Sequence, residues 1–241
     1  MSELQQLQAL VALQGRRVLD VGCGLGDVVL GLARLGADAT GLEISDELLA
    51  PAREADTGHA AAWVVGLAQE LPFDDATFDL VLFMKSLHHV AIAEMTPALA
   101  EARRVLRDDG RIYASEPLLA GSFHELVRLI EDETEVRGAA QRVLDDPSAA
   151  GLRVADVVEY DLHPAFASFD AFAAHVASVD PHRAPVIAAN RARLEATYER
   201  LADVDPASGL RTFRQAMRAH VLDVLLADLL NAGDGWSAAG G

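Results

Sequence analysis

Apolar residues in the first half of the chain form short continuous runs that alternate with segments where they recur every three or four positions. The first pattern indicates a buried strand and the second an amphipathic helix. After a helix over residues 2–14, the predicted elements are strands over 16–21, 39–44, 62–66, 78–84 and 111–115, and helices over 28–35, 46–55 and 96–106. This alternation predicts right-handed βαβ units, and hence an α/β fold with a parallel sheet and helices on both faces.

The pattern changes after Pro117. One long charged helix is predicted over 122–144, a sixth strand over 154–162, and two further helices over 169–179 and 185–201. Residues 212–230 are ambiguous, since their apolar positions fit a helix while the segment 213–217 also fits the start of a closing strand. The tail, 231–241, is rich in glycine and alanine and is expected to be frayed.

Composition places the chain among ordinary globular proteins. Of its 241 residues, 51% are hydrophobic and 24% are charged, which is wrong for a disordered chain. Cys23 is the single cysteine, so a disulfide within the chain is impossible. The N-terminal segment lacks the pattern of a signal peptide, and the longest apolar runs fall short of the ~18 residues of a membrane span. We therefore expect a cytoplasmic protein without a membrane partner.

The charge balance excludes some partners. Acidic residues outnumber basic ones by 37 to 20, for a net charge of −17. A nucleic-acid partner is not expected, because such a protein needs a basic surface against phosphates. Acidity usually serves solubility, and a preference for cationic or small polar ligands is the weaker alternative. No metal site is expected, because the histidines and the one cysteine lack metal-ligand spacing.

A glycine-rich loop follows the first predicted strand and opens the next helix. Gly22, Gly24 and Gly26 allow a tight turn and let the backbone pass close to a ligand. A nicotinamide-binding loop has the spacing G-x-G-x-x-G, but here Asp27 stands at the third glycine and would repel a pyrophosphate. A P-loop is excluded, because no Gly-Lys-Ser/Thr follows.

Glu43 stands at the end of the second predicted strand, at the sheet edge where α/β proteins bind ligands. A carboxylate there accepts hydrogen bonds from two neighbouring ribose hydroxyls. The alternative is an exposed acid that caps the next helix. The spacing of Glu43 from the glycine loop favours the contact with the ribose.

The loop and Glu43 resemble those of the class I S-adenosylmethionine-dependent methyltransferases, particularly the branch that acts on small molecules. The resemblance continues in Leu-Pro-Phe-Asp-Asp-Ala-Thr-Phe-Asp-Leu-Val (71–81), Ser-Leu-His-His-Val (86–90) and Arg-Val-Leu-Arg-Asp-Asp-Gly (104–110), and covers residues 16–117. It implies a Rossmann-like, seven-stranded, mostly parallel sheet with a mainly helical insertion after strand five. Its last strand, antiparallel, then falls at 212–223.

The same resemblance implies a division of the chain. Residues 1–117 form the cofactor-binding core, 118–210 the substrate-specificity cap with the sixth strand, 211–230 the closing element of the sheet, and 231–241 a flexible tail.

The implied cofactor is S-adenosyl-L-methionine. The resemblance implies that Asp20 and the loop backbone hold the methionine end of the cofactor and that Glu43 binds its ribose. Ile44 would pack on the adenine, and Ala68 and Gln69 would border the edge of that ring. The implied cofactor-binding residues are Asp20, Gly22, Cys23, Gly24, Gly26, Glu43, Ile44, Ala68, Gln69 and Lys85.

One position departs from the family pattern. Leu67 stands where many members carry an aspartate that accepts from the adenine amino group. The side-chain carbonyl of Gln69 is able to replace it, and a backbone carbonyl or water is the alternative.

Methyl transfer from a sulfonium is an in-line displacement in which the protein mainly aligns the acceptor. A base is needed only where the acceptor atom carries a proton. The candidate catalytic residues are His89, His88 and Glu116, which follow the fourth and fifth strands. His89 matches the histidine most frequent in the family, and an imidazole titrates near neutral pH. Each also has a structural alternative: packing or backbone hydrogen bonding for the histidines, and helix capping for Glu116.

The leading functional prediction is methylation of a small-molecule acceptor on oxygen, nitrogen or carbon. A catalytically inactive protein that binds S-adenosylmethionine or S-adenosylhomocysteine as a partner or regulator is the main alternative. A nicotinamide oxidoreductase is disfavoured by Asp27. The sequence leaves open the acceptor, the use of a base, and the oligomeric state, a homodimer included.

Overall fold

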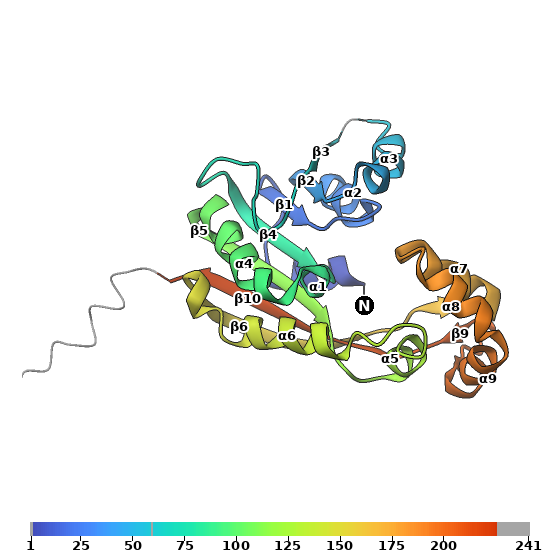
Figure 1. Cartoon of the computed structure of the whole chain (residues 1–241). Helices are drawn as coiled ribbons and strands as arrows, with labels where there is room; N and C mark the ends of the chain where they lie inside the picture. Colours follow the sequence, from blue (N-terminus) through green and yellow to red (C-terminus); the bar gives the residue numbers. More distant parts are fainter. Residues whose placement is uncertain (1, 59, 226–241) are drawn as a thin grey trace, which may run out of the picture.

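The computed structural model describes residues 2–58 and 60–225. Its main element is a seven-stranded sheet with the strand order β3-β2-β1-β4-β5-β10-β6 (Figure 1). The strands are β1 (Arg17–Val21), β2 (Asp38–Glu43), β3 (Ala61–Val65), β4 (Phe78–Met84), β5 (Leu106–Pro117), β6 (Leu152–Leu162) and β10 (Gln215–Val224).

The strand directions confirm the mostly parallel sheet. β1 pairs in parallel with both β2 and β4, and the parallel ladder continues to β3 on one side and β5 on the other. β10 runs antiparallel between β5 and β6. The strand order therefore reverses at β1, and open α/β sheets bind ligands at such a reversal, beyond the carboxyl ends of strands such as β1 and β4.

Alternate residues of the central strands face two apolar layers. Leu19 and Val81 pack with α4 (Met95–Val105) and α6 (Thr134–Asp145). Val18 and Leu82 pack on the other face, with α1 (Glu3–Leu10) and α2 (Asp27–Arg34). Helix α3 (Asp46–Ala55) packs beside β2 and β3. Both faces of the sheet are covered, which explains the short apolar runs in the predicted strands.

Two predicted long helices are wrong, because each is broken. The segment 122–144 forms α5 (Ser122–Val127) and α6, and between them Asp132 accepts hydrogen bonds from the backbone N–H and the hydroxyl of Thr134. A short acidic side chain that binds backbone in this way starts a new helix. The segment 185–201 forms α8 (Arg183–Ala189) and α9 (Arg191–Leu201), which meet at Asn190.

The closing segment resolves the ambiguity of residues 212–230 in favour of a strand as far as Val224. β10 sits between two strands and is largely buried, so its apolar residues pack on both faces of the sheet. Residues 226–230 and the predicted tail, 231–241, lie outside the described residues.

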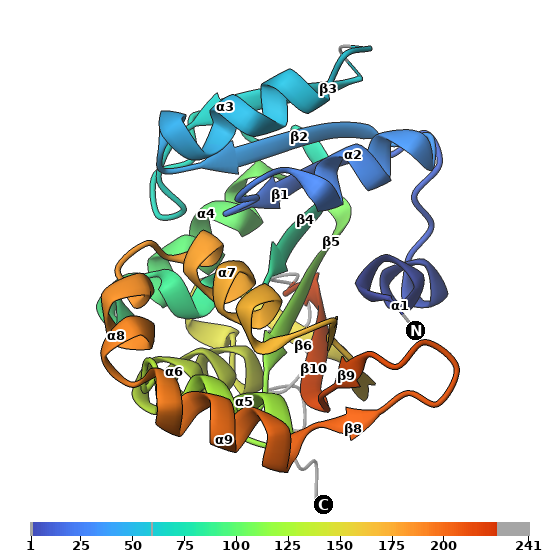
Figure 2. The same ribbon diagram turned by 90° about the vertical axis from the view of Figure 1, so that its right-hand side faces the viewer.

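The segment between β5 and β10 combines a strand with helices. β6 belongs to the main sheet, as predicted, whereas α7 (Phe169–Val179), α8 and α9 lie beyond the carboxyl ends of the parallel strands (Figures 1 and 2). Short strands β7 (Ala165–Phe166), β8 (Asp203–Val204) and β9 (Arg211–Thr212) tie this part together. Its core is an aromatic cluster of Phe166, Phe169, Phe172, Tyr198 and Phe213. None of the described helices combines the length and apolar character that crossing a bilayer requires.

Candidate functional site

The glycine loop joins β1 to α2 at the point where the strand order reverses. Gly22, Gly24 and Gly26 have φ angles of 74°, 53° and 81°, a region that favours glycine. The backbone N–H groups of Gly22 and Cys23 both donate to the carbonyl of Leu42, at 2.8 and 3.0 Å. These bonds attach the loop to the end of β2.

The three glycines differ in what a side chain would meet. A Cβ on Gly22 would lie 2.7 Å from the Cβ of Ser86, and one on Gly26 would lie 2.5 Å from the ring of Trp63. A Cβ on Gly24 would meet no atom of the described chain within 4 Å. Gly22 and Gly26 thus serve packing, whereas Gly24 borders open space that a ligand can enter.

Asp20 lies beside the loop near the end of β1. Only 1% of its surface is exposed, and its Oδ1 has no hydrogen-bond partner among the described residues. Burial, together with the charges of Glu3 and Glu43, raises the pKa of Asp20 to about 7. An unpaired buried carboxylate is costly, so this position favours a ligand that brings positive charge or hydrogen-bond donors.

Glu43 is buried at the end of β2, and both oxygens of its carboxylate are anchored. Oε2 accepts from the N–H of Gly24 at 2.9 Å, and Oε1 accepts from the N–H of Ile44 at 2.8 Å. Each oxygen retains a second lone pair, so the anchored carboxylate is able to accept two ligand hydroxyls. This geometry fits the predicted ribose contact better than a helix cap.

Exposed apolar side chains continue from Glu43. Ile44 is 65% exposed and Leu67 is 37% exposed, both just beyond the carboxyl ends of β2 and β3. Ala68 and Gln69 form the turn that an isolated bridge from Leu67 to Glu70 closes. An apolar surface at this edge suits a flat ring, as predicted for adenine.

Lys85 follows β4 with a φ angle of 58°, and its Nζ lies 2.9 Å from Oε2 of Glu3 on α1. Its predicted role in binding the cofactor stays a prediction, because its ammonium pairs with Glu3. Sequence reasoning missed Glu3, since a single acid in a short amphipathic helix carries no signal of a site.

The predicted catalytic residues meet at the carboxyl ends of β4 and β5. Glu116 is fully buried, and it accepts from the N–H of Leu87 at 2.8 Å and pairs with Nδ1 of His88, which is buried too. The ring of His89 is exposed and lies 4.1 Å from that of His88, centroid to centroid. Partial desolvation and the neighbouring His88 lower the pKa of His89, which favours the neutral imidazole that can accept a proton.

Glu133, just before α6, joins this group in space. One ligand atom from each of His88, His89 and Glu133 lies within 4.8 Å of the others, a spacing that a metal ion could use. However, Glu133 is buried and accepts from the guanidinium groups of both Arg137 and Arg183. Two cations already occupy its carboxylate, so the arrangement fits a hydrogen-bonded network better than a metal centre. The sequence did not point to Glu133, because the fold alone brings it to the histidines.

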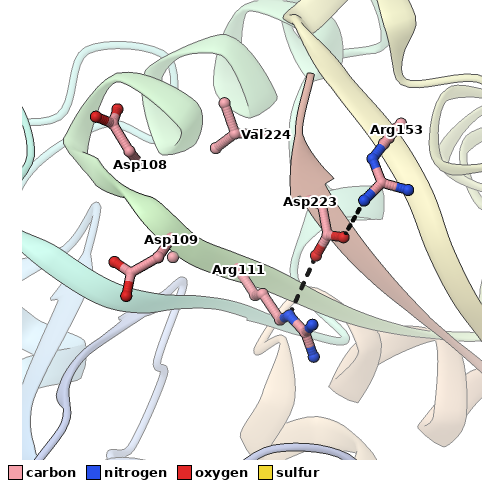
Figure 3. Close-up of a pocket in the computed structure, with 7 residues that line it drawn as sticks. Asp108, Asp109, Arg111, Arg153, Asp223 and Val224 are labelled. Atoms are coloured by element: carbon pink, nitrogen blue, oxygen red, sulfur yellow. Dashed lines mark hydrogen bonds and ion pairs between the residues drawn. The ribbon is translucent and has the colours of Figure 1, made fainter. Parts of the chain in front are cut away.

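A hollow of about 220 Å³ lies at the opposite end of the sheet (Figure 3). Asp223 is held there by Arg111 at 3.1 Å and Arg153 at 2.6 Å. Residues 108–110 lie in the same place, within β5, where the register with β4 shifts. This hollow is remote from the glycine loop and contributes nothing to the site.

The state of Asp20 yields a prediction for S-adenosylhomocysteine binding. A cationic ligand group favours the ionised carboxylate, so affinity should be full above about pH 7 and fall by at most about tenfold per pH unit below it. Asp20→Asn should abolish this dependence, because the amide does not titrate. Calorimetry between about pH 6 and 8 measures both proteins. An equal pH dependence in Asp20→Asn would assign the titration to another group.

Comparisons with known proteins agree with this geometry. Residues 19–114 match the family described as "Methyltransferase domain". A solved structure of the BH2331 protein of Bacillus halodurans aligns with 92% of this chain and 98% of that protein's chain, at a TM-score of 0.59 and 17% identity. The YcgJ protein of Bacillus subtilis covers 91% and 97%, at a TM-score of 0.61 and 18% identity.

Curated relatives match about half of this chain. The 27-O-demethylrifamycin SV methyltransferase of Amycolatopsis mediterranei is 34% identical over 58% of this chain and 53% of its own. A ubiquinone biosynthesis O-methyltransferase of Methylococcus capsulatus is 34% identical over 46% and 48%. The chain thus spans about half the length of the curated relatives it matches. Strand order, glycine loop and matched segment agree, and together they support a class I S-adenosylmethionine-dependent methyltransferase domain over residues 19–114.

Proposed function

We propose that this protein transfers a methyl group from S-adenosylmethionine to a hydroxyl group of a small molecule. The observation that carries the proposal is that the glycine loop with its two carboxylates and the histidine pair meet at one sheet edge. The bound cofactor supplies the methyl group on its sulfonium and the leaving group. The protein supplies alignment, exclusion of water and a proton acceptor.

The residues at the loop fit this cofactor in three respects. The open space at Gly24 admits a ligand close to the backbone, Asp20 has an oxygen with no partner in the described chain, and Ile44 offers an exposed apolar surface. Glu43 would hold the ribose hydroxyls, and Asp20 the methionine end. Ile44 would pack on the adenine.

His89 is the proposed base. Its ring is exposed at the site and its lowered pKa favours the neutral form, so one of its nitrogens is able to take the hydroxyl proton. Glu116 is a positioning residue in this scheme, because both of its oxygens are engaged by the Leu87 N–H and by His88. The fixed His88 ring then supports that of His89.

The choice of a hydroxyl acceptor rests on two observations. A base near the methyl-transfer site is useful only for an acceptor that must lose a proton. Two relatives are named as a 27-O-demethylrifamycin SV methyltransferase and an O-methyltransferase of ubiquinone biosynthesis, names that describe oxygen acceptors. The helical part of residues 118–210, beyond the sheet edge, would select the molecule that carries the hydroxyl.

A second candidate is cofactor binding without methyl transfer. A solved [4+2]-cyclase, SpnF, covers 89% of this chain and 80% of its own at a TM-score of 0.52 and 25% identity. This fold therefore occurs in a protein named for a different reaction. A decisive experiment must detect the methylated product as well as binding.

The experiment incubates the protein with isotopically methyl-labelled S-adenosylmethionine and a panel of hydroxyl-bearing metabolites, and follows products by mass. We expect labelled O-methyl products, and a higher melting temperature with S-adenosylhomocysteine but not with NAD. Stabilisation by NAD alone would contradict the proposal. Stabilisation by S-adenosylhomocysteine without any labelled product would favour the second candidate.

Glu43→Ala tests the ribose contact separately. The substitution removes two charge-assisted hydrogen bonds to the ligand, so S-adenosylhomocysteine affinity should fall by about 1.5–3 kcal/mol, roughly 10- to 150-fold. Calorimetry measures this change, with the exposed Glu54→Ala on α3 as the matched control. Unchanged affinity in Glu43→Ala would exclude the ribose assignment.

A further inference from the structure

Helix α1 precedes the matched methyltransferase segment, 19–114, yet it brings a carboxylate to the site. Its start is fixed by a reciprocal pair in which the Ser2 hydroxyl accepts from the N–H of Gln5 and the Gln5 side chain accepts from the N–H of Ser2. Leu7 is fully buried against the sheet. Glu3, in the first turn, is thereby held near the end of β4, where it pairs with Lys85.

The two oxygens of Glu3 differ. Oε2 pairs with Nζ of Lys85 at 2.9 Å, whereas Oε1 is buried and has no hydrogen-bond partner in the described parts of the chain. A buried carboxylate oxygen without a partner is costly, and the structure provides no donor for it. Glu3 is therefore only half satisfied.

Asp20 shows the same deficiency next to Glu3. Its Oδ1 is unpartnered within residues 2–58 and 60–225, and the charge of Glu3 raises its pKa more than any other charge does. Glu3 also raises the pKa of Tyr113 and Tyr160, on β5 and β6. Lys85, which pairs with Glu3, directly follows β4, and β4 pairs with β1 at Leu82 and Asp20, so Glu3 and Asp20 lie at the same edge of the sheet.

The missing partner can be described by its chemistry. Glu3 and Asp20 offer two unused acceptor atoms, and Lys85 balances one of the two negative charges when both are ionised. A small cation with several N–H donors satisfies both atoms and completes the charge balance. A primary ammonium group meets these requirements. A divalent metal ion fits less well, because the ammonium of Lys85 stands beside the same carboxylate.

We propose that Glu3 and Asp20 together bind the α-ammonium of the cofactor's methionyl group, so that α1 forms one wall of the cofactor site. The inference rests on the proposed function, since it assumes that S-adenosylmethionine binds at the glycine loop. It assigns the amino-terminal helix to binding, and it makes Glu3 a binding residue that the matched segment does not contain. Lys85 then acts as a positioning residue that holds Glu3.

Calorimetry with two probes tests the proposal. The first is S-adenosylhomocysteine, and the second is its deaminated analogue, which keeps the carboxylate and lacks the ammonium. Glu3→Gln preserves the shape of the side chain and removes its charge, so it should weaken S-adenosylhomocysteine by about tenfold. It should change the affinity of the deaminated analogue by less than about twofold, since the contact is already absent there. Glu54→Gln, which removes an exposed charge, should affect neither probe.

Two results would overturn the inference. If Glu3→Gln weakens both probes equally, Glu3 acts on the fold of the site and not on the ammonium. If it weakens neither, Glu3 makes no contact with the ligand. Absence of S-adenosylhomocysteine binding to the wild-type protein would instead contradict the proposed function itself, and the inference with it. Melting temperatures of the free variants show whether Glu3→Gln is folded, and Asp20→Asn provides an independent test, since it should show the same selective loss.

Discussion

His89→Ala should lower turnover by roughly 10²–10⁴-fold, the range expected for the loss of a positioned base. The exposed imidazole of His89 lies beside the ring of His88. Glu116 holds that ring by a hydrogen bond to Nδ1 of His88, so His88 supports His89 on one side. Affinity for S-adenosylhomocysteine should not change, because the loop and Glu43 lie apart from the ring. Single-turnover kinetics measures the chemical step directly.

The pH profile distinguishes a base from a residue that only positions the acceptor. The pKa of His89 is lowered below its usual value of about 6.5, so wild-type activity should be full above that pH and fall as the ring gains a proton below it. The variant should lose this acid limb. Retention of more than about a tenth of wild-type turnover, with a raised KM and the limb intact, would assign His89 to positioning. His88→Ala provides the comparison.

The parallel core was predictable because its signals are local. Each buried strand is a short apolar run, and each ends in a turn or a helix start that neighbouring residues determine. β4 begins and ends where predicted, at Phe78 and Met84. β10 was not readable in this way, since its pattern fits two structures and only its place between β5 and β6 decides.

The broken helices show where local signals fail. Nothing in the composition of residues 128–133 stops a helix, and the break depends on Asp132 binding the start of α6 and on the burial of Ile130. The break also shapes the candidate site. It places Glu133 beside the histidine pair, with Arg137 and Arg183 as its partners.

The residues of the candidate site also fall into two groups, those indicated by local sequence signals and those brought there by packing. Asp20, the glycine loop and Glu43 lie at strand ends, where the sequence pattern indicates a ligand. Glu3 and Glu133 belong to other parts of the chain and reach the site only through packing. For Glu116, its position was predictable, but its pairing with His88 was not.

Gly24→Val should strongly weaken cofactor binding while leaving the protein folded. At this position a Cβ meets no described atom within 4 Å, so the larger side chain enters the space assigned to the cofactor. A steric overlap that costs about 3 kcal/mol would weaken the binding of S-adenosylhomocysteine by roughly 100-fold. The φ angle of 53° adds strain, of about 1–2 kcal/mol for an L-residue, to the cost of folding.

Two further variants separate the steric effect from the strain. Gly24→Ala has a similar backbone strain and a smaller side chain. Its melting temperature should therefore be close to that of Gly24→Val, while its affinity for S-adenosylhomocysteine should be higher. Gly26→Val should act mainly on folding, because a Cβ at this position would lie 2.5 Å from the Trp63 ring and 2.8 Å from the Cβ of Ala52. We expect it to lower the melting temperature more than Gly24→Val does. Calorimetry and thermal melting of all three variants measure these effects. If folded Gly24→Val binds S-adenosylhomocysteine as tightly as the wild type does, the open side of the loop does not face the cofactor, because a bound cofactor there would leave no room for a valine side chain.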